Sequence, residues 1–290
     1  MSILNFGSVN IDHVYRVDHL VRPGETIASR DYQQFPGGKG YNQSIALARA
    51  GAPVRHAGRI GQDGRWLREA LAAEGADVAF LEVVDKPSGH AIIQVDAAGE
   101  NAILLFGGAN RSITAGDAHG ILAHFGPGDW LLLQNEISAM AEILTEAGQR
   151  RMRIVFNPAP MGDEVLAYPL DGVSIFLLNE TEGEAFTGES APPAILAGMR
   201  SRFPQATVVL TLGAEGAVYD DGGEQIYVAG RPVQAVDTTA AGDTFIGYFL
   251  AGISAGEAPR TALERANRAA AICVTRPGAA PSIPRLAEVG

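Results

Sequence analysis

The stretch Asp237-Thr238-Thr239-Ala240-Ala241-Gly242-Asp243-Thr244-Phe245 places two carboxylates on either side of a run of small residues, directly before an apolar segment. We expect it to begin a helix, whose first amides lack intrahelical acceptors and whose dipole stabilises an anion there. Asp243 stands at the same position, where a carboxylate can take the proton from an attacking hydroxyl. The small residues let the amides of residues 240–243 surround a transferring phosphoryl group: Ala240, Ala241 and Gly242.

The same stretch also has a purely structural interpretation. An acidic residue in the first turn of a helix is favoured by the helix dipole, and a glycine before it permits a tight turn. The stretch alone leaves both interpretations open, so other features of the sequence must decide between them.

Composition limits the classes of protein to which the chain can belong. Its 290 residues are 47% hydrophobic, which is enough for a large core in one α/β domain spanning residues 1–290. With 33 acidic and 22 basic residues the formal charge is −11, which argues against nucleic acid or an anionic membrane as a partner. Cys273 is the single cysteine and the six histidines lack metal-ligand spacing, so we expect neither a disulfide nor a structural metal.

The sequence also predicts where the protein resides. Residues 1–10 lack a basic region followed by a long apolar run, and no apolar segment reaches the roughly 18 residues of a membrane span. We therefore expect a cytoplasmic protein with no membrane partner.

Short apolar segments alternate with helical patterns, which predicts βαβ units and a mainly parallel sheet covered on both faces. We expect strands at 3–9, 130–134, 153–157, 174–179 and 207–212, and helices at 42–50, 66–74, 139–147, 193–203, 245–254 and 258–274. In such sheets ligands bind beyond the carboxyl ends of the strands. The polar residues expected there are Asn10, Asp12, Asn135, Glu136, Asn157, Asn179 and Glu182.

Two segments, approximately 11–35 and 88–107, do not follow this alternation of strands and helices. They alternate apolar with polar residues, and the turn at residues 96–100 separates two such runs. We expect them to form a small antiparallel sheet inserted in the single domain. Placed over the carboxyl ends of the strands, it can act as a lid that excludes water, or pair with a second subunit to form a homodimer.

The glycine-rich segments of the sequence do not match two common nucleotide-binding motifs. The segment Gly37-Gly38-Lys39-Gly40-Tyr41-Asn42 has the wrong spacing for a P-loop, and no dinucleotide fingerprint follows the first strand. The glycines instead indicate close backbone approach to a small polar ligand, with Lys39 and Asn42 as donors. A surface turn is the alternative.

At this point the residues match a family. Over nearly its whole length the chain resembles the ribokinase-like (PfkB) family of carbohydrate kinases, whose fold is a three-layer α/β/α sandwich with a small β lid. Two signatures carry the resemblance, the segment 35–43 (Phe-Pro-Gly-Gly-Lys-Gly-Tyr-Asn-Gln) and the segment 237–245. Further matches lie at 7–12, 99–101, 157–160, 179–182, 211–213 and 276–282.

The resemblance implies an ATP-dependent sugar kinase in which Asp243 deprotonates the hydroxyl that attacks the γ-phosphate. Carboxylate acceptors with amide and ammonium donors also suit the fixed hydroxyls of a sugar. Asp12 alone would equally be typical of a turn cap. The resemblance implies a sugar site formed by Asn10, Asp12, Gly38, Lys39, Asn42, Glu136 and Asp243.

The resemblance also implies a nucleotide site and two cations. Asn179 and Glu182 match a motif that supports Mg²⁺ and the phosphates, with Glu182 acting through water; their spacing equally fits a helix capping box. The nucleotide would lie along Thr211, Gly213 and Gly216, with Asn267 near the adenine. A monovalent cation, normally K⁺, would be bound mostly by backbone carbonyls of Asp237, Thr239, Cys273, Arg276, Gly278 and Ser282. Cys273 is therefore expected to be structural and not reactive.

The details of the signatures resemble the ribose-specific branch more than fructokinases, phosphofructokinases or adenosine kinases. They imply transfer to the 5-hydroxyl of D-ribose. Tyr41 and Asn135 depart from the usual pattern, which keeps another pentose, a nucleoside or a hexose open as acceptor. A regulator that only binds sugar or nucleotide is disfavoured, because such a protein needs no base.

Overall fold

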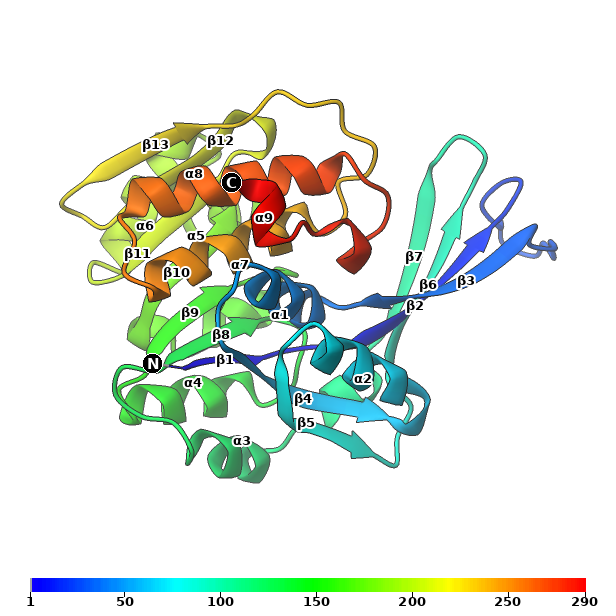
Figure 1. Cartoon of the computed structure of the whole chain (residues 1–290), viewed down its shortest axis with the longest axis horizontal. Helices are drawn as coiled ribbons and strands as arrows, with labels where there is room; N and C mark the ends of the chain where they lie inside the picture. Colours follow the sequence, from blue (N-terminus) through cyan, green and yellow to red (C-terminus); the bar gives the residue numbers. More distant parts are fainter. Residues whose placement is uncertain (1) are drawn as a thin grey trace.

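The computed structural model describes residues 2–290 and has three layers, α/β/α (Figure 1). Within these residues the middle layer is a nine-stranded sheet in the order β13-β12-β11-β10-β9-β8-β1-β4-β5. The strands from β11 to β5 pair in parallel, and β12 and β13 add an antiparallel edge. The strands are β1 (Ile3–Phe6), β4 (Val54–Gly61), β5 (Asp77–Val84), β8 (Trp130–Gln134), β9 (Arg153–Asn157), β10 (Val173–Asn179), β11 (Thr207–Thr211), β12 (Gly216–Asp220) and β13 (Gln225–Ala229).

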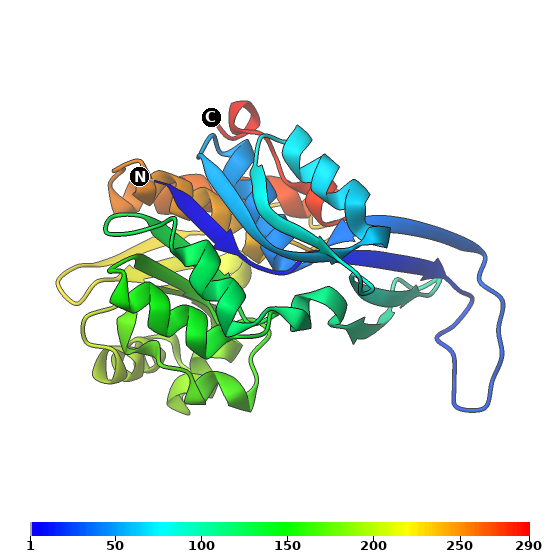
Figure 2. The same cartoon turned by 90° about the horizontal axis from the view of Figure 1, so that it is seen from below.

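Helices cover both faces of this sheet, so its central strands are apolar on both sides. In β8, Leu131, Leu132 and Leu133 are all fully buried and alternate between two cores. One core lies under α1, α2, α7 and α8, and the other lies under α3 to α6; Figure 2 shows the two groups on opposite sides. The helices are α1 (Lys39–Arg49), α2 (Arg65–Ala73), α3 (Ala115–Leu122), α4 (Met140–Gln149), α5 (Glu180–Thr187), α6 (Pro192–Arg202), α7 (Ala241–Ser254), α8 (Pro259–Val274) and α9 (Leu286–Val289).

A second, small sheet projects from the body of the molecule (Figures 1 and 2). Its order is β3 (Asp31–Gly37), β2 (Asn10–Arg16), β6 (Gly89–Val95) and β7 (Asn101–Phe106). The outer pairs β3–β2 and β6–β7 are antiparallel, as the alternation predicts, but the central pair β2–β6 is parallel. The reason is the chain path: β2 and β6 follow β1 and β5, two strands of the same direction, so both leave the main sheet the same way.

The fold class predicted from the sequence is confirmed. The strands β8 and β9 have the predicted bounds, whereas β1 stops at Phe6 because the chain passes through Gly7 into β2. The strands β4 and β5 were not predicted, since Arg55, Arg59 and Glu82 interrupt their apolar pattern. Within residues 2–290, no helix combines the length and the apolar character that crossing a membrane requires.

Candidate active site

The first turn of α7 is an open anion site. Ala240 caps the helix in the left-handed conformation, with φ of 60°, which costs about 1 kcal/mol and turns the following amides outward. The Ala241 amide donates to the Thr238 carbonyl at 3.2 Å, so it is already occupied. The amides of Ala240, Gly242 and Asp243 have no protein acceptor among the described residues. Nothing lies within 4 Å of where a side chain at Gly242 would begin, so these amides have room for a phosphate.

Asp243, in the same turn, is only 7% exposed and is held by α1. The side-chain amides of Asn42 and Gln43 donate to its two carboxylate oxygens at 3.0 and 2.8 Å. Hydrogen bonds to a charged group contribute about 1.5–3 kcal/mol each, so they fix the carboxylate beside the open amides. Asn42 therefore contacts the predicted base directly, through a donor that the sequence had suggested for the ligand.

Lys39 is the first residue of α1 and lies among acidic groups from three other elements. Burial lowers the pKa of its ammonium, but the charges of Asp243, Glu136 and Glu182 outweigh this effect and raise the pKa above its ordinary value. Lys39 therefore keeps its proton at neutral pH and is a fixed positive charge for a phosphoryl group passing between donor and acceptor.

One cavity of about 210 Å³ joins these groups at the carboxyl ends of β9, β10 and β11. This position follows from the fold, because parallel strands leave their following loops on the same edge of the sheet. The predicted site residues that line it are Lys39, Asn179, Glu182, Thr211, Ala240, Ala241, Gly242 and Asp243.

The remaining predicted sugar residues lie where the small sheet meets the body. Glu136 accepts hydrogen bonds from the Ser8 hydroxyl and, at 2.9 Å, from the Lys39 amide. Gly38 has φ of 91°, so the chain can pass close to Asn10 there without a side chain. Burial, with a smaller effect of the Glu136 charge, raises the pKa of Asp12 from 3.8 to about 7. The charges of Asp12 and Glu136 thus interact, and their carboxyl oxygens are suited to accept hydrogen bonds from hydroxyls.

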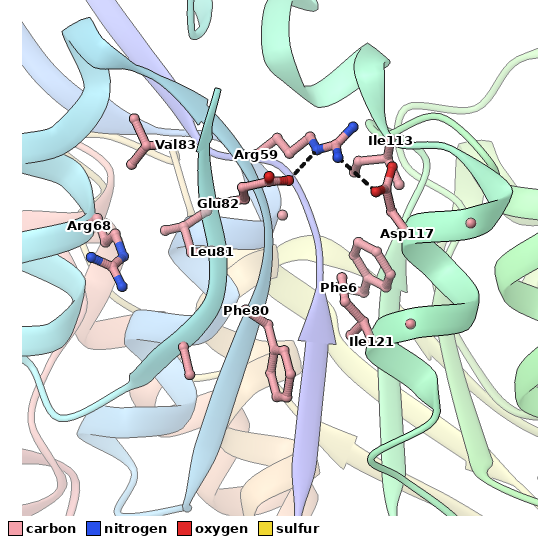
Figure 3. A pocket seen from close by; sticks show the side chains of 14 residues that line it. Phe6, Arg59, Arg68, Phe80, Leu81, Glu82, Val83, Ile113, Asp117 and Ile121 are labelled. Carbon is pink, nitrogen blue, oxygen red and sulfur yellow. Dashed lines mark hydrogen bonds and ion pairs between the residues drawn. The ribbon is translucent and has the colours of Figure 1, made fainter. Parts of the chain in front are cut away.

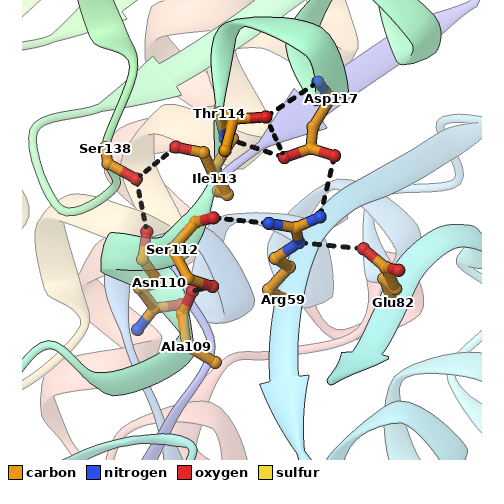
Figure 4. Close-up of polar contacts among 9 residues, drawn as sticks. All are labelled: Arg59, Glu82, Ala109, Asn110, Ser112, Ile113, Thr114, Asp117 and Ser138. Atoms are coloured by element: carbon orange, nitrogen blue, oxygen red, sulfur yellow. Dashed lines mark hydrogen bonds and ion pairs between the residues drawn. The ribbon is translucent and has the colours of Figure 1, made fainter. Parts of the chain in front are cut away.

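Asn10 is positioned by a segment that the sequence had not singled out, the 3₁₀ turn Gly108–Ser112. The Asn110 side-chain oxygen accepts a hydrogen bond from the Val9 amide at 3.1 Å, and its side-chain nitrogen donates to the Asn10 side-chain oxygen at 2.7 Å. Figure 4 shows how the turn is anchored, by Ser138 on one side and by Arg59, which donates to the Ser112 carbonyl. The ion pairs of Arg59 with Glu82 and Asp117 therefore help to hold this turn, and with it Asn10, although none of these three residues lies among the predicted sugar residues.

Asn179 and Glu182 form the capping box of α5, so this alternative from the sequence is confirmed. The Glu182 carboxylate accepts from the backbone and side-chain nitrogens of Asn179 at 3.0 and 3.1 Å. Glu182 also lines the cavity, where burial and the Asp243 charge raise its pKa against the opposing effects of Asn179 and Lys39. Capping and a role in the cavity are therefore compatible.

The predicted nucleotide residues are spread along one edge of the site. Thr211 lines the cavity, and Gly213 is exposed directly beyond it. Gly216 has φ of 111° and no space for a side chain against the Val228 carbonyl, so it is required by the β12–β13 hairpin. Asn267 donates to the carbonyls of Val228 and Ala229 at 3.1 and 3.3 Å, which ties α8 to β13.

The segments predicted to bind a monovalent cation lie together, although they are far apart in the sequence. Asp237 accepts from the amides of Thr239 and Gly278 at 2.9 and 2.8 Å, and the Cys273 thiol lies 2.9 Å from the Ser282 hydroxyl. The Arg276 side chain pairs with Glu288, which leaves its backbone carbonyl as the group predicted to bind the cation. Carboxylate, hydroxyl and carbonyl oxygens gathered in this way suit K⁺.

The cavity that holds these groups is not distinguished by its size. Another cavity, of about 600 Å³, lies between β5 and α3 (Figure 3), where Phe6, Phe80 and Ile121 form an apolar wall. The predicted site residues are not among those that line it, and Arg59, which reaches its rim, is already paired with two carboxylates. Size alone therefore does not locate the chemistry.

Several supporting residues were missed by sequence reasoning. Ser8 and Gln43 lay in the quoted motifs but had no assigned role, and Asn110 lay outside them. A signal was available for Gln43, because a polar residue on the buried face of a helix needs hydrogen-bond partners. The two departures from the family pattern lie away from the cavity: Tyr41 is packed in a core, and Asn135 bonds Pro160, Glu164 and Tyr168.

Comparisons with known proteins agree with this geometry. The profile of the pfkB family of carbohydrate kinases matches residues 2–286. The chain is 38% identical to a ribokinase of Haemophilus influenzae, over 97% of this chain and 95% of that protein. It is 35% identical to a ribokinase of Schizosaccharomyces pombe, over 100% and 96% of the two chains.

Solved structures give the same result. A ribokinase of Cryptococcus neoformans in complex with ADP superposes with a TM-score of 0.87 at 37% identity, covering 99% of this chain and 98% of that one. Arabidopsis thaliana ribokinase complexed with ribose and ATP gives a TM-score of 0.87 at 30% identity, covering 99% and 96%. The chain belongs to the pfkB family of carbohydrate kinases and is itself a carbohydrate kinase.

Proposed function

We propose that this enzyme transfers the γ-phosphate of ATP to the 5-hydroxyl of D-ribose, with Asp243 as the general base. One observation carries the proposal: a buried carboxylate, fixed by Asn42 and Gln43, stands beside open helix amides and the Lys39 ammonium in a single cavity. Ribose is supported by the relatives, several of which are named ribokinases, and by the one crystallised with ribose and ATP.

The reaction follows from these positions. Asp243 accepts the proton of the 5-hydroxyl while the oxygen of that hydroxyl bonds to the γ-phosphorus. The bond between the γ-phosphorus and the oxygen that bridges it to the β-phosphate breaks at the same time, which releases ADP. The amides of Gly242 and Asp243 and the Lys39 ammonium oppose the charge that develops on the transferring group. Asn10, Asp12 and Glu136 hold the sugar on the opposite side, so that the 5-hydroxyl faces Asp243.

Two cations complete the proposal. Mg²⁺ neutralises phosphate charge when bound, and we assign Glu182 to hold it through water, since the ion retains most of its hydration shell. We assign K⁺ to the oxygens of residues 237, 239, 273, 276, 278 and 282, where it would order the loop before α7. Because the reaction needs Mg-ATP, we also propose that the enzyme works in the cytoplasm.

We further propose that the small sheet acts as a lid and pairs with a second copy of the chain. The support is β7, whose side chains Ile103, Leu104, Leu105 and Phe106 are 50–67% exposed, an apolar surface that a monomer leaves in water. Leu104→Glu should give a monomer by light scattering while the wild type is a dimer. A wild-type monomer at assay concentration excludes the pairing.

The test of the reaction is ADP release from Mg-ATP with D-ribose, 2-deoxyribose, other pentoses, fructose, fructose phosphates and nucleosides, with and without K⁺. We expect saturable turnover on ribose that rises with K⁺. Turnover only on a hexose or a nucleoside would retain the mechanism and reject ribose as the acceptor.

A further inference from the structure

A chain of buried polar side chains leads from the base into the core. It crosses three strands of the main sheet and α1, and each member has an exposed fraction of 0%. Burying polar groups in a core is unfavourable unless each finds a partner, so this arrangement needs a reason. The members are Asn5 on β1, Gln43 and Ser44 on α1, His56 on β4 and Gln134 on β8.

The links are short and have a defined direction. The Gln43 side-chain nitrogen donates to Asp243 at 2.8 Å, and its oxygen accepts from the Gln134 nitrogen at 2.7 Å. The same Gln134 nitrogen donates to the Asn5 oxygen at 2.9 Å. Asn5 in turn donates from its side-chain nitrogen to the Gly40 carbonyl and to the Ser44 hydroxyl, both at 2.7 Å.

The Gly40 carbonyl sets this direction, because a backbone carbonyl can only accept. Asn5 must therefore present its nitrogen to Gly40 and its oxygen to Gln134. Gln134 must then present its nitrogen, which leaves Gln43 with its oxygen toward Gln134 and its nitrogen toward Asp243. At the far end the chain stops at His56, 2.8 Å from Ser44, where burial lowers the pKa of the imidazole to about 4 and keeps it neutral.

We propose that Gln43 and Gln134 are positioning residues for phosphoryl transfer, Gln134 acting on Asp243 through Gln43. This inference rests on the proposed function, in which Asp243 is the base. The chain forces a donor toward one carboxylate oxygen of Asp243, which fixes the rotation of that carboxylate. That oxygen keeps a lone pair for the sugar hydroxyl. The charged groups around the carboxylate are Lys39, Glu136 and Glu182, none of which belongs to the chain.

The decisive variant is Gln134→Glu, which changes one atom two links away from the reacting atoms. A buried, protonated glutamic acid has one donor, so it cannot serve both Asn5 and Gln43. When Gln43 loses this donor, nothing holds its side chain in one orientation, and the carboxylate of Asp243 is no longer fixed. We expect kcat to fall by roughly tenfold, with the ribose KM unchanged.

Leu132→Val is the matched control, since Leu132 lies on the same strand and the same face and makes no polar contact in the chain. It should lower stability without lowering kcat. If Gln134→Glu does not fold, Gln134→Met removes the same donors without adding an acid, and the same fall in kcat at unchanged ribose KM is expected. A folded variant with the wild-type kcat would overturn the inference.

A second readout separates this inference from the reaction itself. The carboxylate of Asp243, labelled with ¹³C and assigned by its loss in Asp243→Asn, can be observed by NMR without substrate. We expect its chemical shift to change in Gln134→Glu and not in Leu132→Val, even if ribose proves not to be the acceptor. An unchanged chemical shift overturns the positioning role, whereas a changed one in an enzyme silent on every sugar overturns only the proposed function.

Discussion

The part of the site proposed to bind the sugar, called here the acceptor end, differs from the part proposed to bind the nucleotide, called the donor end. The two ends differ in how many of their groups are buried and held by other parts of the protein. At the acceptor end, Asn10, Asn42 and Asp243 are at most 8% exposed, and each has a protein hydrogen-bond partner. At the donor end, residues 231–239 are almost all exposed, and Val236 is 65% exposed. Under the proposed function, the difference means that the protein alone positions the groups that would hold the sugar and the base, whereas the nucleotide would supply part of its own site by covering apolar side chains and occupying free amides.

The largest effect on activity is expected at the acceptor end, from the substitution Asp243→Asn. The substitution keeps the shape of the side chain but removes the proton acceptor, so we expect turnover to fall by a factor on the order of 10² to 10⁴ with ribose affinity nearly unchanged. Calorimetry of ribose binding and single-turnover kinetics measure the two quantities separately. A variant that keeps most of its turnover removes Asp243 from the role of base.

At the boundary between the two ends, Glu182→Gln tests the magnesium assignment. The amide can still accept a hydrogen bond from Asn179, so α5 keeps much of its cap. Loss of the charge should weaken Mg²⁺ activation by about 10- to 100-fold, as expected of a group that holds a metal through water. The test is a magnesium titration of activity at saturating ATP. Glu180→Gln, in the same turn but exposed, is the control and should titrate as the wild type does.

Much of this comparison could be predicted from the sequence. The first turn of α7 and the polar residues Asn179 and Glu182 came from local patterns, because a helix start and a strand end fix which groups are free, whereas Thr211 came from the family resemblance. Which distant segments contact one another in the folded chain could not be predicted. Nothing in the order of residues says that Gln43 faces Gln134, or that β2 pairs in parallel with β6, since both depend on which elements the folded chain brings together.

Two residues predicted to contact the nucleotide also have a structural role. Gly216 was expected along the nucleotide, and its conformation is also required by the β12–β13 hairpin. Asn267 was expected near the adenine, and its nitrogen is engaged by β13 carbonyls. The spacing of residues cannot separate such structural requirements from ligand contacts, because both select small or polar side chains at the same points of the fold.

The pH dependence of sugar binding sharpens the comparison further. The pKa of Asp12 is raised to about 7, and its ionised form is the better acceptor for a hydroxyl. Ribose affinity should therefore rise with pH by up to about tenfold between pH 6 and 8, and level off above. Stability has the opposite sign: the folded protein binds more protons than the unfolded chain between pH 3.8 and about 7, so the free energy of unfolding falls as the pH rises through this window.

Calorimetry of ribose binding across this pH range measures the effect, with Asp12→Asn as the comparison. The amide does not titrate, so its ribose affinity should be weaker and flat with pH. If the wild-type affinity is already flat, the carboxyl of Asp12 does not contact the sugar.

The smallest expected effect tests the donor end. Val236 is exposed four residues before the left-handed Ala240, close in sequence to the free amides of α7. If the nucleotide covers this side chain, Val236→Ser removes about 1 kcal/mol of apolar burial and raises the KM for ATP about fivefold, with kcat and the KM for ribose unchanged. Val21→Ser is the control, because Val21 is 42% exposed on the connection between β2 and β3, away from the nucleotide edge. Since the acceptor end is built by the protein alone, an effect of Val236→Ser on ribose instead of ATP would mean that the two ends are formed together, and the contrast between them would fail.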